Sequence, residues 1–500
     1  MRVLHLVFQL HEPYGLSFGS EAGDENNFNR DVLGGYFDVK ESFTRNNQEV
    51  YQPLFALMER NLQKNPKWHF SLMISGMWLE LAERYDQNLL ERLKKILKSG
   101  KVELIFEPYY HSLAFFYNRE EFTLHVQQFL DKVGELFDVQ GRIMAMPELI
   151  YNDEIGKWAE DFGFAGMLVG GALGQMDWRS ANHVYEAAEC EYLRLLVENR
   201  KISEMIARGD VEILGERKSE DGEIRQEFAL KRLEKVLDLE LLRGGLINIV
   251  VDAKVLARQR KNGIIRLFDE LIASWTRNEK NGFVNAAEAC VVETPTMELA
   301  VRETVSRRED LRAERVGLVL KSDLEYQLPG WLSGGEQKAL ADKMYGMRRE
   351  VLASENEMII EDYRRMLAID MYTQVPELAE KVVMDLRRRV NEVKKSQAVE
   401  ISRTYTKKRD RGIVGSGVVP VKFSRGNHGV ASVVVHETSR QEAQLVPVQR
   451  LRLTDGEDRK VVKKVADTGV EVKIEAEAVA KKKPKKMGAI RRVIKKLVIE

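Results

Sequence analysis

Short apolar runs and amphipathic patterns alternate along the first part of the chain. Runs of β-branched and apolar residues bounded by Gly, Pro or polar turns predict buried strands, and apolar positions with helical periodicity predict helices. Strands are predicted at residues 3–10, 68–74, 101–106, 142–145, 165–169, 246–252 and 282–284, and helices within 37–65 and at 88–99, 119–137, 153–162 and 263–276. This rhythm predicts parallel strands joined by crossover helices.

Polar motifs recur where the predicted strands end. The first strand closes on residues 11–13 (His-Glu-Pro), the third on 107–111 (Glu-Pro-Tyr-Tyr-His), the fourth on 146–153 (Met-Pro-Glu-Leu-Ile-Tyr-Asn-Asp), and a later one on Asp252. The carboxyl ends of parallel strands meet at one face, which favours an α/β barrel or a doubly wound sheet with its functional face there. Glu148, just past a Pro at a strand-to-helix turn, is expected to point into the mouth of that fold.

The pattern changes along the rest of the chain. Residues 171–243 mix helical and charged stretches, and strand-like runs then give way to charged helical patterns through 338–393. Beyond residue 397, basic pairs, a Gly-Ser-Gly and Val-rich runs at 418–423 and 430–435 predict either a small β module or a largely disordered segment. The predicted division is a barrel domain at 1–300, an α-helical domain at 301–397 and a poorly ordered or small β tail at 398–500.

Composition narrows the classes of function. The 78 basic and 78 acidic residues cancel to a net charge of zero, so no whole-chain field favours nucleic acid or a membrane. The basic stretch 481–500 is typical of a solvated, mobile end, with an anionic partner as the alternative. Two cysteines, Cys190 and Cys290, form neither a disulfide framework nor a Cys-x-x-Cys zinc motif. Without a signal-peptide pattern or a run of about 18 apolar residues, a cytoplasmic location is expected.

Four motifs, taken in order, resemble glycoside hydrolase family 57, in its alpha-amylase-like branch. Residues 11–14 (His-Glu-Pro-Tyr) are similar to that family's His-Gln-Pro opening, with Glu in place of Gln. Residues 75–76 (Ser-Gly) and 107–113 (Glu-Pro-Tyr-Tyr-His-Ser-Leu) resemble its second and third blocks. Residues 147–155 (Pro-Glu-Leu-Ile-Tyr-Asn-Asp-Glu-Ile) resemble its nucleophile region closely. The resemblance spans roughly residues 1–375, and the third and fourth blocks are its specific parts.

The resemblance implies an incomplete, TIM-like (β/α)7 barrel followed by an α-helical domain. It also implies a retaining hydrolase, or a 4-alpha-glucanotransferase-like protein, that acts on alpha-1,4-glucans. The family's nucleophile falls on Glu148 and its general acid/base on Asp252, at the end of the strand 247–252. Retaining hydrolysis needs two carboxyl groups about 5–5.5 Å apart, and strand ends of one barrel can supply that spacing. The acid must also be held protonated near neutral pH.

The sequence departs from the family pattern around the acid/base. Where the family has acidic and aromatic companions, residues 253–259 read Ala-Lys-Val-Leu-Ala-Arg-Gln. Lys254 and Arg258 are expected to lower the pKa of Asp252 and favour its ionised form, which does not suit a general acid. The late Asp-His motif reads Asp370-Met371-Tyr372, without its His. The alternative function is therefore a catalytically silent homologue that binds glucan or serves as a scaffold.

Purely structural roles are the alternative to catalysis and sugar binding for these residues. Glu148 could be a charge favouring the dipole of the following helix, and Asp252 a strand-end cap or an ion-pair partner of Lys254. His11 and His111 could be core histidines, although their positions at two strand ends favour contacts to sugar hydroxyls.

Aromatic residues carry the same ambiguity. Tyr14, Tyr109, Tyr110 and Trp178 could be core or rim residues, or platforms that stack on a pyranose. No metal ligand spacing is present, Gly170-Gly171 lacks the context of a phosphate loop, and no cofactor is expected. The candidate substrate-binding residues are His11, Glu12, Tyr14, Tyr110, His111, Trp178 and Asp370.

Overall fold

The computed structural model describes most of the chain up to Asp410. The described residues are 2–12, 39–171, 176, 178–208, 226–254, 256, 263–295, 297–307, 332, 335–373, 376–410, 462–464 and 471–473. Tyr14, Arg258 and the Val-rich runs at 418–423 and 430–435 lie outside them. Two compact units are present, one that contains Met1–Val393 and one of Lys394–Ala489.

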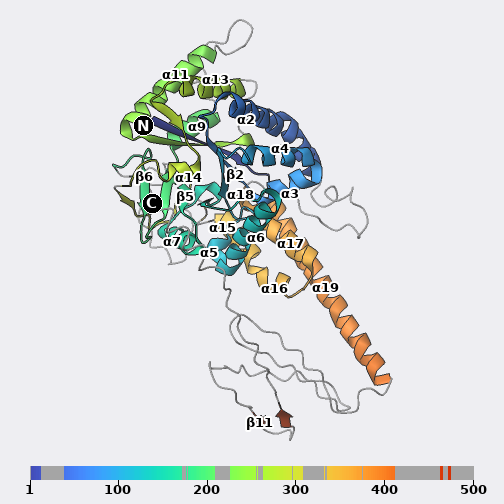
Figure 1. Cartoon of the computed structure of the whole chain (residues 1–500). Coiled ribbons are helices and arrows are strands. Elements are labelled where there is room, and N and C mark those ends of the chain that lie inside the picture. The colour runs from blue at the N-terminus through green and yellow to red at the C-terminus, as the bar shows by residue number, and fades with distance from the viewer. Residues whose placement is uncertain are drawn as a thin grey trace. The chain divides into compact units, whose positions relative to one another are not determined.

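A single curled sheet forms the centre of the first unit (Figure 1). Its parallel strands follow the spatial order β8-β1-β2-β3-β4-β5-β7. These strands are β1 (Arg2–Leu10), β2 (Phe70–Ile74), β3 (Val102–Phe106), β4 (Ile143–Ala145), β5 (Gly166–Val169), β7 (Arg194–Val197) and β8 (Leu246–Asp252). Three shorter strands extend the sheet: β6 (Val184–Ala187) runs antiparallel to β7, β10 (Glu298–Leu299) pairs with β6, and β9 (Asn281–Phe283) pairs with β1.

The sheet curls until its two ends meet. Glu198, directly after β7, forms a parallel bridge with Asn248 of β8. The Asn199 N–H donates to the Asn248 carbonyl at 2.8 Å, and the Asn248 side-chain amide donates to the Val197 carbonyl at 2.9 Å. The seam between β7 and β8 is short compared with the other strand pairs, so the barrel is incomplete. The prediction of an incomplete (β/α)7 barrel is confirmed.

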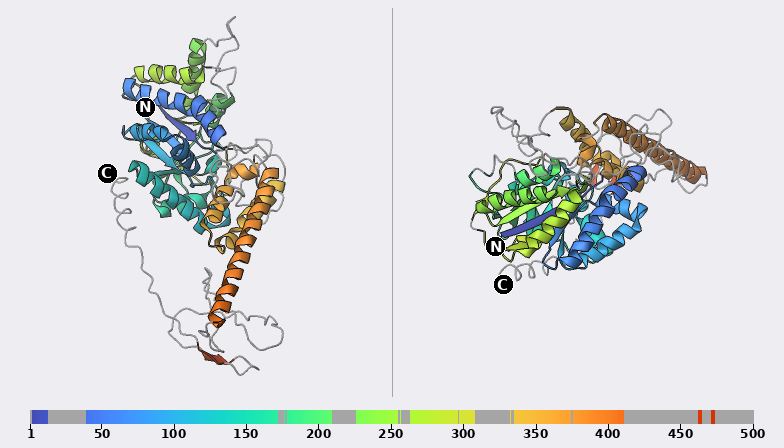
Figure 2. Two further views of the ribbon diagram at one scale, coloured as in Figure 1. Left: turned by 90° about the vertical axis from the view of Figure 1, so that its right-hand side faces the viewer. Right: turned by 90° about the horizontal axis from the view of Figure 1, so that it is seen from above.

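Amphipathic helices cover the outside of the sheet, as the two views of Figure 2 show. Helix α4 buries five apolar side chains and begins at Asp86, whose carboxylate accepts the Leu89 N–H. Helix α7 begins after Asn152, whose side chain accepts the Ile155 N–H, and ends at Gly163, which has a φ of 116°. The helices of this part are α1 (Val39–Asn46), α2 (Gln52–Lys64), α3 (Gly76–Tyr85), α4 (Gln87–Leu97), α5 (Ala114–Tyr117), α6 (Arg119–Phe137), α7 (Asp153–Phe162), α9 (Arg200–Arg208), α11 (Gln226–Glu240), α13 (Ile264–Arg277) and α14 (Ala286–Ala289).

A second set of helices packs on the barrel at one side of α6. The set is α15 (Gly335–Gly346), α16 (Arg348–Leu352), α17 (Glu357–Met366), α18 (Ile369–Thr373) and the first part of α19 (Pro376–Asp410). The buried Glu121 of α6 accepts from Arg348 and from Arg364, each at 2.8 Å. This confirms that helices follow the barrel. The division at residues 300 and 397 stays a prediction, because barrel and helices share one compact unit up to Val393.

The second unit holds the end of α19 and a two-stranded antiparallel pair, β11 (Val462–Lys464) with β12 (Glu471–Lys473). No helix among the described residues is long and apolar enough to cross a membrane.

Several short strands escaped the sequence prediction, among them β6 and β7 of the barrel sheet. Both β6 and β7 lie within residues 171–243, where charged residues interrupt the apolar pattern. Each is four residues long, and such short runs carry little periodic signal.

A buried polar group fastens three neighbouring strands. His5 of β1 lies between Ser71 of β2, at 2.9 Å from Nε2, and Asn248 of β8, at 2.8 Å from Nδ1. Because the Asn248 amide group donates elsewhere, its oxygen accepts the His5 Nδ1–H, and Nε2 accepts from the Ser71 hydroxyl. Burial lowers the pKa of His5 to about 4, although the bond to Asn248 opposes the shift.

We predict a specific loss of stability in acid. His5 binds a proton near pH 6.5 when unfolded but near pH 4 when folded, so stability rises with pH across that interval and falls on acidification through it. For this one group the loss is about 2 kcal/mol between about pH 7.5 and about pH 5. Urea unfolding at both pH values measures it. The His5→Gln variant should lack this component, and an equal loss in the variant would contradict the assignment.

Candidate active site

Carboxylates gather at one edge of the barrel. Five of the parallel strands end at an acid or are followed by one within a few residues: Glu12 after β1, Glu107 after β3, Glu148 after β4, Glu198 after β7 and Asp252 at the end of β8. Because these strands run parallel in one curled sheet, the five side chains belong to the same rim. The rim contains both residues that the sequence indicates as catalytic.

The turn that carries Glu148 has an unusual backbone. Pro147–Leu149 forms a single 3-10 turn in which Glu148 and Leu149 have φ angles of 55° and 51°. Non-glycine residues in this left-handed region cost about 1 kcal/mol or more each. The helix α7 begins only at Asp153, with Asn152 as its own cap. Glu148 is therefore outside that helix's first turn, and the simpler role of a helix-dipole charge loses its support.

A later segment holds this turn in place. Tyr151 and Val305 exchange two backbone hydrogen bonds of 2.9 Å, and the Arg307 N–H donates to the Glu148 carbonyl at 2.9 Å. Residues 301–307 thus run along the turn, and their bonds offset part of its backbone strain.

Lys254 lies beside Asp252 but pairs with another carboxylate. The Lys254 backbone N–H donates to Asp252 Oδ1 at 2.8 Å, whereas its ammonium group lies 3.4 Å from Glu12 Oε2. Burial alone would lower the pKa of Lys254, but the carboxylates of Glu12 and Asp370 raise it above its usual value. Glu12 also accepts from the Tyr51 hydroxyl at 2.6 Å. Of the two simpler roles of Asp252, the contact with the Lys254 N–H is that of a strand-end cap, while the Lys254 ammonium group pairs with Glu12.

Arg307 brings a second cation into the rim. Its guanidinium donates to Glu198 Oε1 at 2.8 Å, and the Glu198 side chain is fully buried. Burial raises the pKa of Glu198 although Arg307 opposes the shift. Burial would lower the pKa of Arg307, but Glu198, Glu148 and Asp252 together raise it. Gly171 permits this arrangement, because a Cβ there would collide with the Glu198 carbonyl oxygen.

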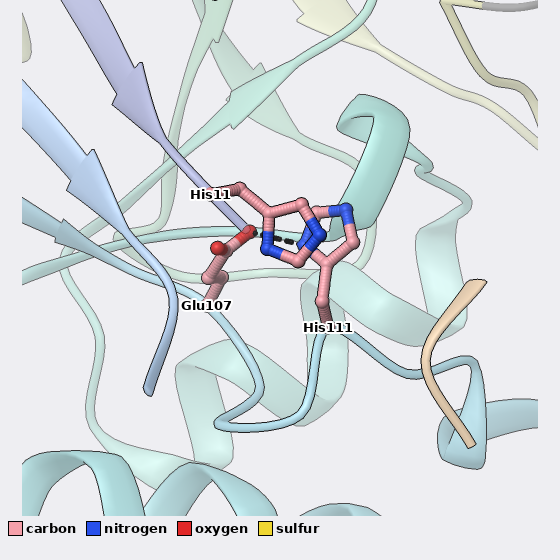
Figure 3. Close-up of side chains that lie close together, drawn as sticks. All are labelled: His11, Glu107 and His111. Atoms are coloured by element: carbon pink, nitrogen blue, oxygen red, sulfur yellow. Dashed lines mark hydrogen bonds and ion pairs between the residues drawn. The ribbon is translucent and has the colours of Figure 1, made fainter. Parts of the chain in front are cut away.

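Two stacked histidines, His11 and His111, form another part of the rim. The rings of His11 and His111 lie face to face, with centroids 3.9 Å apart and planes at 21° (Figure 3). His11 Nε2 donates to Asp370 Oδ2 at 2.7 Å, and its Nδ1 lies 2.9 Å from Ser75 Oγ. Burial would raise the pKa of Asp370, but His11 holds it far below its usual value. Asp370 of α18 therefore joins the helical part to the end of β1.

His111 belongs to a second imidazole–carboxylate pair. Its Nδ1 donates to Glu107 Oε2 at 2.9 Å, and both side chains are buried. Burial would lower the pKa of His111, but Glu107 raises it above its usual value. The other Glu107 oxygen has no hydrogen-bond partner among the described residues. The His111 carbonyl accepts the Ile369 N–H at 3.0 Å, which ties this loop to α18 as well.

The fold places three potential metal ligands together where sequence spacing indicated none. One ligand atom each from His11, Glu107 and His111 lies within 4.8 Å of the others. Imidazole binds a metal through a lone pair in the plane of its ring, and face-to-face rings cannot aim two such lone pairs at one ion. Both His11 nitrogens, moreover, already have partners. This arrangement fits a hydrogen-bonded cluster better than a metal centre.

The candidate aromatic residues lie in different surroundings. Tyr110 is buried, and its hydroxyl donates to Glu361 of α17 at 2.8 Å. Tyr109 donates to Glu80 at 2.9 Å. Trp178 is 77% exposed, a position compatible with stacking on a ligand. Roles of Tyr110 and Trp178 in substrate binding stay predictions.

The structure thus gathers six of the residues expected from the sequence at the rim: His11, Glu12, His111, Glu148, Asp252 and Asp370. Sequence reasoning placed Glu107 in a strand-end motif without giving it a role, and it missed Glu198 and Arg307. Glu107 and Glu198 each follow a short apolar run directly, which is the signal that could have found them. Arg307 follows no strand motif, and nothing in the sequence marks it.

Comparisons with known proteins identify the family of this chain. The model of glycosyl hydrolase family 57 matches residues 5–287. The chain belongs to this family. A curated relative, the "Putative alpha-amylase" of Methanocaldococcus jannaschii, is 24% identical over 360 residues, which cover 70% of each chain. The family assignment makes the chain a glycosidase-like enzyme.

Three solved structures share the fold. The alpha-amylase AmyC from Thermotoga maritima superposes with a TM-score of 0.55 at 10% identity, covering 80% of this chain and 94% of that one. The 4-alpha-glucanotransferase from Thermococcus litoralis gives 0.54 at 13% identity, covering 87% of this chain but only 63% of that one. The branching enzyme from Pyrococcus horikoshii gives 0.53 at 12% identity, covering 77% and 88%.

We predict that the histidine cluster binds no divalent metal in solution. Because the stacked rings and their hydrogen bonds leave no convergent lone pairs, added Zn²⁺ should not raise the melting temperature. Elemental analysis of the purified protein should find no stoichiometric metal. The prediction is wrong if Zn²⁺ stabilises the protein and the effect disappears in His111→Gln while persisting in a variant of His183, a half-buried histidine outside the cluster.

Proposed function

We propose that this family 57 chain is a retaining enzyme that cleaves or transfers alpha-1,4-glucans. In this proposal Glu148 is the nucleophile and Asp252 the general acid/base. The observation that carries it is the position of both carboxylates at the ends of β4 and β8 on one barrel rim, with Glu148 on a strained turn. The names of the relatives, an amylase, a glucanotransferase and a branching enzyme, support glucan as the substrate class.

The reaction would proceed in two displacements. The Glu148 carboxylate attacks the anomeric carbon while Asp252, as the acid, gives its proton to the departing glycosidic oxygen. A covalent glycosyl ester on Glu148 results. Asp252, now a carboxylate, takes a proton from water or from an acceptor sugar hydroxyl. That oxygen attacks the anomeric carbon, releases Glu148 and leaves Asp252 protonated again. Water gives hydrolysis, and a sugar acceptor gives chain transfer.

The remaining rim residues would bind the sugar. The imidazole of His111 and the carboxylate of Asp370 offer donors and acceptors that suit sugar hydroxyl groups, whereas both nitrogens of His11 are held by Ser75 and Asp370. The bonds of His11 to Asp370 and of His111 to Glu107 fix these side chains before substrate arrives, which reduces the entropy lost on binding. Trp178 would add an exposed aromatic face that suits stacking on a pyranose.

A second candidate function is a catalytically silent glucan-binding homologue. The observation that favours it is the pair of cations, Lys254 and Arg307, that interact with carboxylates of the rim. Cations close to a general acid oppose its protonation. The two candidates differ in turnover but not in glucan binding.

We predict that the wild-type protein redistributes chain lengths in maltooligosaccharides and that Glu148→Gln loses this activity by roughly three orders of magnitude or more. The amide cannot act as a nucleophile, while the fold is unaffected. Product chromatography measures the distribution. Glu135→Gln, an exposed change on α6, is the matched control and should retain full activity.

Rescue by azide distinguishes the nucleophile from the general acid/base. With an activated glycosyl fluoride as donor, azide should restore turnover in Glu148→Gly with inversion at the anomeric carbon, and in Asp252→Ala with retention. Reversed stereochemistry would exchange the two assignments. Glucan binding without any turnover in the wild type would instead establish the silent homologue.

A further inference from the structure

Arg307 contacts both segments that carry the proposed catalytic carboxylates, the Glu148 turn and strand β8. Its backbone is bonded to the Glu148 carbonyl, and its guanidinium is anchored on Glu198, the acid that follows β7. Since β7 closes the barrel against β8, this anchor directs the positive charge toward the strand that ends at Asp252. The guanidinium also lies 3.5 Å from the Val250 carbonyl of β8, which confirms its direction.

The close approach of this segment is built into the fold. A Cβ on Gly170 would lie 3.2 Å from the Arg307 nitrogen and 3.2 Å from the Leu149 carbonyl oxygen, so only glycine lets the two segments lie together without adjustment. The bridge between Tyr151 and Val305, two residues before Arg307, joins the same segment to the Glu148 turn. Arg307 is therefore set in one place relative to Glu148.

The surroundings of the guanidinium explain why a cation is needed there. Three carboxylates, Glu148, Glu198 and Asp252, act together on Arg307 and favour its charged form against the effect of burial. A retaining mechanism brings two of these acids within a short distance of each other. In that mechanism Asp252 carries the proton before the reaction, so the charge of the fixed guanidinium stabilises Glu148 in its carboxylate form, which is the form that attacks.

We propose that Arg307 is a positioning residue that holds Glu148 and Asp252 together as the reacting pair. This inference rests on the proposed function, because it assigns a partner to the same two carboxylates. Arg307 acts through Glu148 and Glu198, not on the sugar. Both the shape and the charge of the guanidinium contribute. One of its nitrogens donates to Glu198, and its positive charge acts on Glu148 and Asp252.

The first test is chemical rescue. Arg307→Ala should lower kcat/KM on maltooligosaccharides about 100-fold, mostly in kcat, with KM changed little. Guanidinium should restore part of kcat, whereas urea at equal concentration, planar but uncharged, should not. Equal rescue by urea, or activity within threefold of wild type, would overturn the proposal. Arg266→Ala, whose side chain is 70% exposed on α13, is the matched control.

The second test needs no turnover. The melting temperatures of wild type, the two single variants Glu148→Gln and Arg307→Met and the double variant form a cycle. Glu148→Gln should raise the melting temperature more in the Arg307→Met background than in wild type, because Arg307 no longer offsets the charge of Glu148 there. Equal effects in both backgrounds would show no coupling and overturn the proposal. If wild type turns over no glucan, the proposed function fails, and this cycle alone decides the role of Arg307.

A pair of polar variants that differ in charge covers failure to fold. Arg307→Lys and Arg307→Gln differ in charge, so the Lys variant should be at least tenfold more active and should melt at a higher temperature. Identical behaviour of the two variants would show that charge at this position has no role.

Discussion

Charge compensation is the constraint on which the rest of the site depends. Five carboxylates gather at the ends of parallel strands, and two like charges about 5 Å apart repel by about 3 kcal/mol at an effective dielectric constant of about 20. The structure offsets this repulsion with four groups from different parts of the chain: Lys254 beside Glu12, Arg307 on Glu198, His111 on Glu107 and His11 on Asp370. Glu12, Glu198 and Asp370 each have a partner from a distant part of the chain, whereas Glu107 pairs with His111 four residues later.

This arrangement makes the rim a joint product of the barrel and the segments that follow it. Asp370 and the Ile369 N–H reach the histidine loops from α18, and residues 301–307 reach the Glu148 turn from the chain after β10. The barrel strands alone would present a strained turn, a buried Glu198 without Arg307 and a His11 without Asp370. Docking of the later segments therefore completes the site, and the free energy of that docking is coupled to the geometry around Glu148 and Asp252.

The sequence predicted the scaffold well because its signals are local. Strands at β1 and β8 and helices α6 and α7 follow from apolar runs and caps that need no distant information. Glu148 and Asp252 stand in motifs that can be read directly. Arg307 could not be found this way, because its role depends on a bridge between residues 151 and 305 that only the fold creates. The same is true of the His11–Asp370 bond, whose partners are 359 residues apart.

The departures from the family pattern acquire a physical meaning from this geometry. The loss of acidic and aromatic companions after Asp252 suggested from the sequence that the acid/base had lost its support. In the structure the Lys254 ammonium group lies 3.4 Å from Glu12, its backbone N–H donates to Asp252, and the charges of Glu12, Asp370 and Asp252 all raise the pKa of Lys254. The late motif lacks a neighbouring His, yet Asp370 pairs with His11 from the first strand. Two carboxylates of this part of the structure thus have partners from other parts of the chain: Lys254 lies beside Glu12, and His11 bonds to Asp370. Two buried imidazole–carboxylate pairs and a guanidinium bonded to the buried Glu198 each cost desolvation, which their partners must offset. That all three are present favours a site with altered support over one that has decayed.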